Sequence, residues 1–528
     1  MNIKRKNTTK EYSWKVPSFE CGVLSEPLLA FGSQHQHIDP KTGLALYGSY
    51  SLVGQDKPSI TSIILGIVGP PSMISDAEQW LRSCKNIVTN EGKEPFLYPH
   101  FPGINTGLPF QCELIFGDTW REQIKQEEIT KAIDIINFNA KIKRIVELYI
   151  EAIEILSQRE PKPDVILCCI PQEVIEYCTK KNIDGVNRRI KLSRKERKVL
   201  KEAKMGQKFF PFPKDYRVLK MEDEYLPYEN LYRGLKTEVM RFSIPTQLIW
   251  PKTLQLIDQK EKSKRSTQDA ATRAWNFFTG IYHKAGGSPW RLAEIESGVC
   301  FVGISFYRDL HEKNTTLRTS LAQAFTSAGD GYVLRGNTFE WEDDEKSKSP
   351  HLDYTSAYSL ITDVIDLYKR QNRGSLPNRI VVHKSSRFWE DEHKGFEDAC
   401  ENIPRKDFVA FGWRGVQFYR PGTYPPLRGT YIKFSECNFL LYLLGYIPFL
   451  RSYPGPRAPQ PIEILEHHGD SPWDTVLTEI LALTKMNWNT ADFACGKPVT
   501  LAFSRKVGLI LAELPKYQKP KEEYRFYM

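Results

Sequence analysis

The sequence predicts an α/β protein of two or three domains, and three observations lead to this prediction. The chain has 528 residues, more than one hydrophobic core usually contains. Two of its regions show β-branched runs that alternate with helical periodicity, the pattern of an open α/β sheet. Its composition, with 41% hydrophobic and 26% charged residues, is that of an ordinary globular protein.

The first α/β region follows an N-terminal segment, residues 1–58, that is rich in glycine, proline and serine. We expect this segment to pack on a larger body. The region itself spans residues 59–285 and starts with a β-branched strand that ends in a Gly-Pro-Pro turn. Its predicted elements are strand Ile60–Val68, helix Ser75–Cys84, strand Gln111–Phe116, one long amphipathic helix Ile129–Leu156 and strand Asp164–Ile170.

The second α/β region starts at Val299. It begins with an apolar strand, which a hairpin through Gly329–Gly336 should follow. The other predicted elements alternate between strand and helix, as in the first region. They are strand Cys300–Tyr307, strand Thr338–Trp341, helix Ala357–Gln371 and strand Asn378–His383.

Several classes of protein are disfavoured by what the sequence lacks. No apolar run reaches the roughly 18 residues that span a bilayer. The N-terminus has no apolar signal core, so we expect a cytoplasmic protein without a membrane partner. The ten cysteines form no CxxC pair, which favours reduced, buried thiols over zinc. The net charge of +9 is compatible with a nucleic-acid partner but does not single one out.

Other polar segments leave alternatives open. Residues 179–208 are strongly basic and could be a solvated face or a patch that contacts a nucleic-acid backbone. Residues 259–268 look like a linker or surface loop. His467–Asp470 has side chains of metal-ligand type, but a surface loop is the favoured interpretation.

An aromatic-rich stretch, Phe408–Tyr424, is expected to pack against the sheet. Three arginines lie in it or just after it, at Arg414, Arg420 and Arg428. They could touch backbone phosphates or could serve structural roles in the core or on the surface.

A tyrosine and a lysine four residues apart form the first functional motif. On a helix, Tyr232 and Lys236 share one face and can point into one pocket. Gln247 follows in Ser-Ile-Pro-Thr-Gln, and Lys284 precedes Ala-Gly-Gly-Ser-Pro-Trp. A tyrosine ring can stack on a nucleobase, while lysines and an amide can bind a terminal phosphate.

The second motif lies near the C-terminus, where Leu483-Thr-Lys-Met-Asn-Trp is followed by Gly496-Lys-Pro-Val-Thr. Together the two motifs resemble Argonaute proteins: the first is similar to their MID domain and the second to the end of their PIWI domain. The resemblance covers about residues 60–528. No PAZ-sized region precedes the MID-like part, so the resemblance is to the short prokaryotic class.

This resemblance implies a Rossmann-like MID domain over residues 59–285 and an RNase H-like PIWI domain over residues 286–528. It also implies that Tyr232, Lys236, Gln247 and Lys284 bind the 5′ phosphate of a guide strand. Relatives hold a Mg²⁺ there with the C-terminal carboxylate, which implies Met528 and Gln247 as ligands here. The aromatic tail of this sequence favours a buried C-terminus over a surface strand.

The acidic residues that slicing Argonautes use to hold two divalent ions are not found. Ser305 ends the first strand where those relatives have Asp, and Ser385 takes the place of a second Asp. The last ligand would follow a strand at Pro498–Thr500, at or beside Phe503. The sequence does not place the glutamate finger, for which Glu340 is one candidate. Neither serine nor phenylalanine can hold Mg²⁺ as a carboxylate does, so we expect no nuclease activity.

The function implied is guide-directed sensing, in which a 5′-phosphorylated guide, expected to be RNA, pairs with single-stranded DNA. The resemblance further implies an APAZ-containing effector subunit, with a TIR, sirtuin-like or nuclease module, that acts in defence against plasmids or phage. Two alternatives remain open. One is an active guide-directed DNA endonuclease, and the other is a nucleic-acid-binding scaffold that needs no guide.

Overall fold

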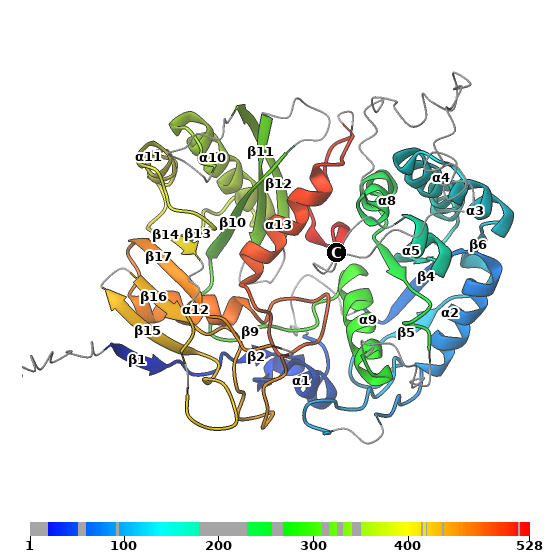
Figure 1. Cartoon of the computed structure of the whole chain (residues 1–528), viewed down its shortest axis with the longest axis horizontal. Helices are drawn as coiled ribbons and strands as arrows, with labels where there is room; N and C mark the ends of the chain where they lie inside the picture. Colours follow the sequence, from blue (N-terminus) through cyan, green and yellow to red (C-terminus); the bar gives the residue numbers. More distant parts are fainter. Residues whose placement is uncertain are drawn as a thin grey trace, which may run out of the picture.

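The computed structural model describes residues 19–528 apart from 51–59, 91–93, 179–229, 256–267, 309–315, 325–330, 341–349, 413–415, 419, 436–437, 456 and 516–517. Two α/β bodies lie side by side, and the C-terminus lies between them (Figure 1). The mixed α/β fold predicted from the sequence is confirmed. The basic stretch 179–208 and nearly all of the expected linker lie outside the described residues.

The first body is built on a parallel sheet in the order β5-β4-β7-β8, with β6 also paired to β4. Helices α2 and α9 pack on one face, and helices α3, α4, α5 and α8 on the other. The strands are β4 (Ser62–Gly69), β5 (Glu113–Ile115), β6 (Arg121–Gln123), β7 (Val165–Cys169) and β8 (Thr246–Ile249). The helices are α2 (Pro71–Ser83), η2 (Asp118–Trp120), α3 (Gln126–Ile133), α4 (Phe138–Ser157), α5 (Gln172–Cys178), α8 (Leu231–Val239), η3 (Met240–Phe242) and α9 (Ala270–Lys284).

The single long helix expected at Ile129–Leu156 is wrong, because the chain breaks there into α3 and α4. Asn137 is the N-cap of α4, and its side-chain oxygen accepts a hydrogen bond from the backbone N–H of Ala140 at 2.9 Å. Apolar periodicity continues across the break, but the local capping bond favours a new helix start.

The second body contains a nine-stranded sheet in the order β1-β15-β16-β17-β14-β13-β10-β11-β12. Strands β10, β11 and β12 are antiparallel, whereas β13 and β14 run parallel to β10, which is the strand arrangement of RNase H. The strands are β10 (Val299–Arg308), β11 (Thr316–Ala324), β12 (Tyr332–Glu340), β13 (Arg379–Lys384), β14 (Arg405–Gly412), β15 (Thr430–Ser435), β16 (Asn438–Leu441) and β17 (Ile462–Gly469).

Helices cover both faces of this sheet. Helices α10 (Tyr354–Gln371) and α11 (Glu390–Ala399) pack on the face to which Val302 and Ile304 point. Helix α13 (Val499–Leu511) packs on the opposite face, against Phe301 and Tyr307, and α12 (Trp473–Leu483) packs beside β16 and β17.

Two local predictions for this body differ from the structure. The predicted hairpin is present, since β11 and β12 are antiparallel neighbours, but its second strand begins at Tyr332 and not at Thr338, so Gly336 lies inside β12. The strand expected at Pro498–Thr500 is the start of α13 instead. Proline is well tolerated just before the first turn of a helix, where its missing N–H costs nothing. Pro498 occupies this position, as the N-cap of α13.

The N-terminal segment joins the second body. β1 (Glu20–Val23) pairs with β15, and β2 (Leu29–Ala30) pairs with β9 (Arg291–Leu292) and β3 (Gln36–His37). η1 (Gly32–Gln34) and α1 (Pro40–Tyr47) complete it. Glu26 forms ion pairs with two buried cations. Its carboxylate oxygen Oε1 lies 3.0 Å from Nε of Arg428 and 2.7 Å from Nζ of Lys485. Arg428 therefore has a core role and is not available to a phosphate.

Candidate nucleic-acid interface

Helix α8 places the tyrosine and the lysine of the first motif together. Its N-cap, Asn230, accepts a hydrogen bond from the backbone N–H of Tyr232, which fixes where the helix starts. Lys236 follows one turn later, with its Nζ 5.7 Å from the centre of the Tyr232 ring. The lysine is fully buried, and its Nζ donates to the carbonyl oxygen of Thr246 at 2.5 Å. The pairing predicted from their spacing is therefore present.

Gln247 and Lys284 reach the same place from β8 and α9. Lys284 is the last residue of α9 and is 1% exposed. Its Nζ donates to the side-chain oxygen of Gln247 at 2.6 Å. The Gln247 amide donates in turn to the carbonyl oxygen of Leu248 at 2.9 Å. The four residues predicted to form one pocket thus converge from three elements.

A fifth residue of the cluster was missed in the sequence. Lys506, on α13, has its Nζ 5.9 Å from the centre of the same Tyr232 ring. It lies in the segment that carries the second motif, which had been assigned to the other domain. The sequence shows a lysine shortly after that motif, but nothing in the sequence connects it with Tyr232. Only the packing of α13 against α8 brings Lys506 to the tyrosine ring.

The electrostatic state of this cluster favours an anion. Burial, followed by the charge of Lys506, lowers the pKa of Lys236 to about 7. Burial, followed by the charges of Lys236 and Lys506, also holds the pKa of Lys284 well below its usual value. Buried ammonium groups that repel one another are stabilised when a negatively charged ligand lies between them. The cluster therefore has the properties of a phosphate site.

The C-terminus lies at this cluster. Met528 is 4% exposed and Tyr527 is fully buried, so the alternative of a surface strand is wrong. The Tyr232 hydroxyl donates to the carbonyl oxygen of Tyr527 at 3.2 Å. The tail forms a short 3-10 helix, η4 (Tyr524–Phe526), and the Tyr524 ring stacks on Phe503 with 3.8 Å between ring centres.

The donors available for a metal ion at this position are few. Among the described residues, no group of three or more His, Cys, Asp or Glu side chains could hold a metal. The side-chain oxygen of Gln247 already accepts the Lys284 ammonium. A Mg²⁺ would therefore rely on the Met528 carboxylate and on the phosphate itself, both of which are hard oxygen ligands.

The two serines that were compared with nuclease ligands, Ser305 and Ser385, lie side by side. Ile304 pairs with Lys384 in the parallel β10–β13 register, so Ser305 of β10 lies beside Ser385, the residue that directly follows β13. The Ser305 hydroxyl is buried and has no hydrogen-bond partner in the described part of the chain. Neither serine offers a carboxylate. The Glu340 side chain lies outside what the structure describes.

On α13, Thr500 lies against these strands, and the Phe503 ring stacks on Tyr524. The Thr500 hydroxyl lies 2.8 Å from Nδ1 of His383, and its carbonyl oxygen lies directly against Gly303. A Cβ at Gly303 would be 2.0 Å from that oxygen, so the close approach requires glycine. Burial lowers the pKa of His383 to about 3, which keeps this ring neutral. Helix α13 therefore packs directly on this face of β10.

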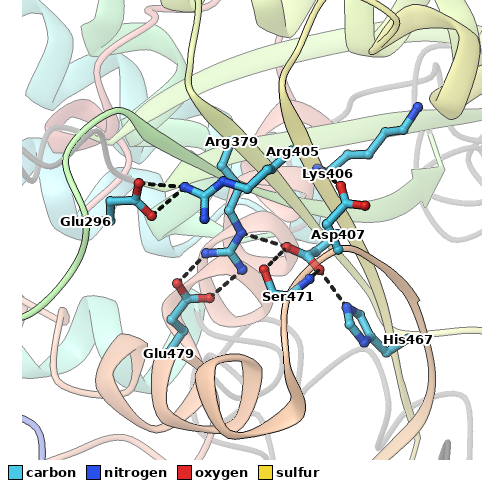
Figure 2. Close-up of polar contacts among 9 residues, drawn as sticks. Glu296, Arg379, Arg405, Lys406, Asp407, His467, Ser471 and Glu479 are labelled. Carbon is cyan, nitrogen blue, oxygen red and sulfur yellow. Dashed lines mark hydrogen bonds and ion pairs between the residues drawn. The ribbon is translucent and has the colours of Figure 1, made fainter.

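A separate polar network lies at the other end of β13 and β14 (Figure 2). Arg379 donates to Asp407 at 2.6 Å and to Glu479 at 2.5 Å. Burial alone would raise the pKa of Asp407, but hydrogen bonds from His467, Ser471 and Arg379 lower it to about 2. His467 lies in β17, so the predicted surface loop at His467–Asp470 is wrong. Every group of this network has a partner, and the network ties α12 to the sheet.

Comparison with known proteins supports the fold assignment. No family model matches the chain. The curated protein argonaute of Aquifex aeolicus (strain VF5) is 25% identical over 290 residues, which are 53% of this chain and 36% of that protein.

Solved structures match over nearly the whole chain. Clostridium butyricum Argonaute bound to a guide DNA and a 19-mer target DNA has a TM-score of 0.59 at 15% identity, covering 94% of this chain and 53% of that one. Drosophila Piwi has a TM-score of 0.54 at 13% identity, covering 96% and 56%. An Aquifex aeolicus Argonaute structure has a TM-score of 0.53 at 16% identity, covering 96% and 57%.

The two α/β bodies therefore form the MID–PIWI architecture, with a Rossmann-like and an RNase H-like half, as the sequence predicted. In sequence and in fold the chain is similar to Argonaute proteins. It spans only about half the length of these solved chains. In the described ranges, none of the helices is long and apolar enough to cross a lipid bilayer.

Proposed function

We propose that this protein binds the 5′-phosphorylated end of a guide strand in the pocket formed by Tyr232, Lys236, Gln247, Lys284 and Lys506. The observation that carries this proposal is the convergence of buried lysines around one tyrosine ring, with pKa values lowered by burial and by mutual repulsion. A terminal phosphate supplies the negative charge that this cluster favours. The Tyr232 ring supplies a stacking surface for the first base.

We further propose that the bound guide selects a complementary strand by base pairing. A related solved structure, that of Clostridium butyricum Argonaute, contains both a guide DNA and a target DNA. In such a division of labour the protein grips the backbone and sequence is read by pairing. A guide of RNA and a target of single-stranded DNA remain the expectation for this chain, in the cytoplasm.

The output of recognition is proposed to come from another subunit. Ser305, Ser385 and Thr500 supply no carboxylate, so cleavage by this chain is not expected. The resemblance to short prokaryotic Argonautes implies an APAZ-containing partner with a TIR, sirtuin-like or nuclease module, and a role in defence against plasmids or phage.

The test of guide binding is to compare strands that differ only at their 5′ end. Nucleic acid that co-purifies with the protein is sequenced, and short strands with 5′ phosphates are expected. Affinities for 5′-phosphate and 5′-hydroxyl strands of RNA and of DNA are then measured. Equal affinities, together with co-purified strands of random length, would favour a scaffold that needs no guide.

Restoring carboxylates at the degenerate centre should not restore cutting. The Ser305→Asp, Ser385→Asp double variant is expected to cleave no target above background in Mg²⁺ or Mn²⁺, because two-metal catalysis needs every ligand in place. The α13 position is still held by Thr500 and its bond to His383. Cleavage of a guide-matched target is measured after confirming that the variant still loads a guide. Robust cutting would support the rival function, a guide-directed DNA endonuclease.

Extending the C-terminus should weaken guide loading. Met528 is buried and the adjoining Tyr527 carbonyl accepts from Tyr232, so added residues must displace the tail from the pocket. We propose that the Met528 carboxylate shares a Mg²⁺ with the guide phosphate. Loading by a tagged chain should fall about tenfold or more. Chelation should weaken loading in the untagged chain and change little in the tagged one.

The control for this experiment is the same tag placed at the N-terminus, which should leave loading unchanged. Equal affinity for C-terminally tagged and untagged chains would show that the C-terminal tail takes no part in guide binding.

A further inference from the structure

A second site candidate lies in the second body, between the loop that follows β14 and the loop that follows β16. It is a cavity of about 580 Å³. Its walls include the rings of Phe418, Tyr424 and Tyr453 and the guanidinium-bearing residues Arg420 and Arg457. No carboxylate is found among the described residues that line it. The cavity is thus aromatic and positively charged.

Two side chains of the cavity wall, Arg420 and Tyr424, form a stack with the neighbouring Tyr446. The guanidinium carbon of Arg420 lies 5.7 Å from the centre of the Tyr446 ring. The Tyr446 ring stacks on that of Tyr424, with 4.6 Å between centres and 29° between planes. Tyr424 is 40% exposed. Because this ring lines the cavity and is accessible, a further flat ring can be added to the stack.

Hydrogen-bonding capacity is also unused at the cavity. The Nε of Arg420 is buried and makes no hydrogen bond within the described part of the chain. Arg457 is exposed at the same cavity. Two arginines without a neighbouring carboxylate favour an anionic ligand, such as a phosphate.

We propose that this cavity binds one nucleotide of a single strand, with its base stacked on Tyr424 and its phosphate bound by Arg420 and Arg457. This assignment goes beyond the guide pocket, since it shares no residue with it. A stacking ring beside cationic groups binds nucleotides with little dependence on sequence. Of the three arginines considered from the sequence, Arg420 therefore has the phosphate role, Arg428 is a core residue, and Arg414 lies outside the described residues.

The test uses a fluorescein-labelled strand of ten thymidines with a 5′ hydroxyl, so that it cannot use the phosphate pocket. Tyr424→Ala should weaken its binding about fivefold or more, because one stacked base is lost. Tyr424→Phe keeps the ring and should bind as the unmodified protein does. Arg420→Gln with Arg457→Gln should reduce the slope of log affinity against log salt by about 1.4, from two lost phosphate contacts on a single strand.

A charge-matched control is Arg370→Gln with Arg387→Gln, two exposed arginines of the same body that pair with Glu522 and Glu466. This pair should leave the salt slope unchanged. An equal loss of slope in the control pair would overturn the proposal, as would unchanged affinity in Tyr424→Ala. Failure of the guide pocket would not produce either result, because loading of 5′-phosphorylated strands is scored separately.

Discussion

Replacing both Lys236 and Lys284 with methionine should abolish loading of 5′-phosphorylated strands and, at the same time, raise the thermal stability of the unloaded protein. Each lysine–phosphate contact is worth about 1.5–3 kcal/mol, so losing two weakens binding by roughly 10²–10⁴-fold. Both ammonium groups are buried and repelled by Lys506. Methionine keeps the volume of the side-chain stem and removes the buried charge.

The gain in stability should depend on pH in a defined direction. Burial holds the folded-state pKa of Lys236 near 7, below the ordinary lysine value of 10.5. The charge penalty is therefore fully present below pH 7 and disappears as the pH rises toward 10.5. The melting temperature of the variant should exceed that of the unmodified protein most at pH 6–7 and least above pH 9.

The matched control is Lys131→Met with Lys369→Met, which removes the same charge from exposed positions paired with Glu128 and Asp366. Loading and melting temperature should both be unchanged there. Loading of 5′-phosphorylated strands at the wild-type level by the Lys236/Lys284 variant would contradict the assignment of these lysines to the phosphate pocket. A lower melting temperature would instead show that the two lysines are needed for the fold.

Guide loading should weaken as the pH rises above 7. Lys236 titrates near pH 7 in the free protein, and a bound phosphate dianion raises the pKa of an adjacent ammonium. Binding therefore takes up a proton above pH 7, and affinity falls by up to about tenfold per pH unit for each such lysine. A 5′ monophosphate is a dianion only above about pH 6, so affinity should be highest between about pH 6 and 7.

This profile is measured by fluorescence anisotropy from pH 6 to 9 with a 5′-phosphorylated strand. The 5′-hydroxyl strand serves as the control and should give a flatter curve. The single variant Lys236→Met should also flatten the profile. Affinity that increased between pH 7 and pH 9 would contradict a role for these lysines in phosphate binding.

Four of the five residues of this cluster were predicted from the sequence, because they belong to short, recognisable motifs. Tyr232 and Lys236 share a helical face, and a helix needs only its own periodicity to place them together. The convergence of β8 and α9 on that face depended on the family resemblance. Lys506 could not be found in this way, since its position depends on how α13 packs on another body.

The errors of the sequence analysis have local causes. The break between α3 and α4 is set by one capping side chain at Asn137, which apolar periodicity does not reveal. The segment after Pro498 is apolar enough for a strand or a helix, and packing on β10 and β11 decides for the helix. His467 was expected in a surface loop, but it hydrogen-bonds to the buried carboxylate of Asp407, sixty residues away in sequence, and so belongs to the polar network.

The position of helix α13 limits which parts of the molecule can be exchanged with those of a relative. Its first turn is held against the sheet through Thr500, while Lys506, about 9 Å further along the axis, reaches Tyr232 in the other body. A fragment ending at residue 285 would retain four of the five pocket residues but would lose Lys506 and the Tyr527 carbonyl. Chimeras that combine the first body of this chain with the second body of a relative would load guides only where that relative supplies both groups.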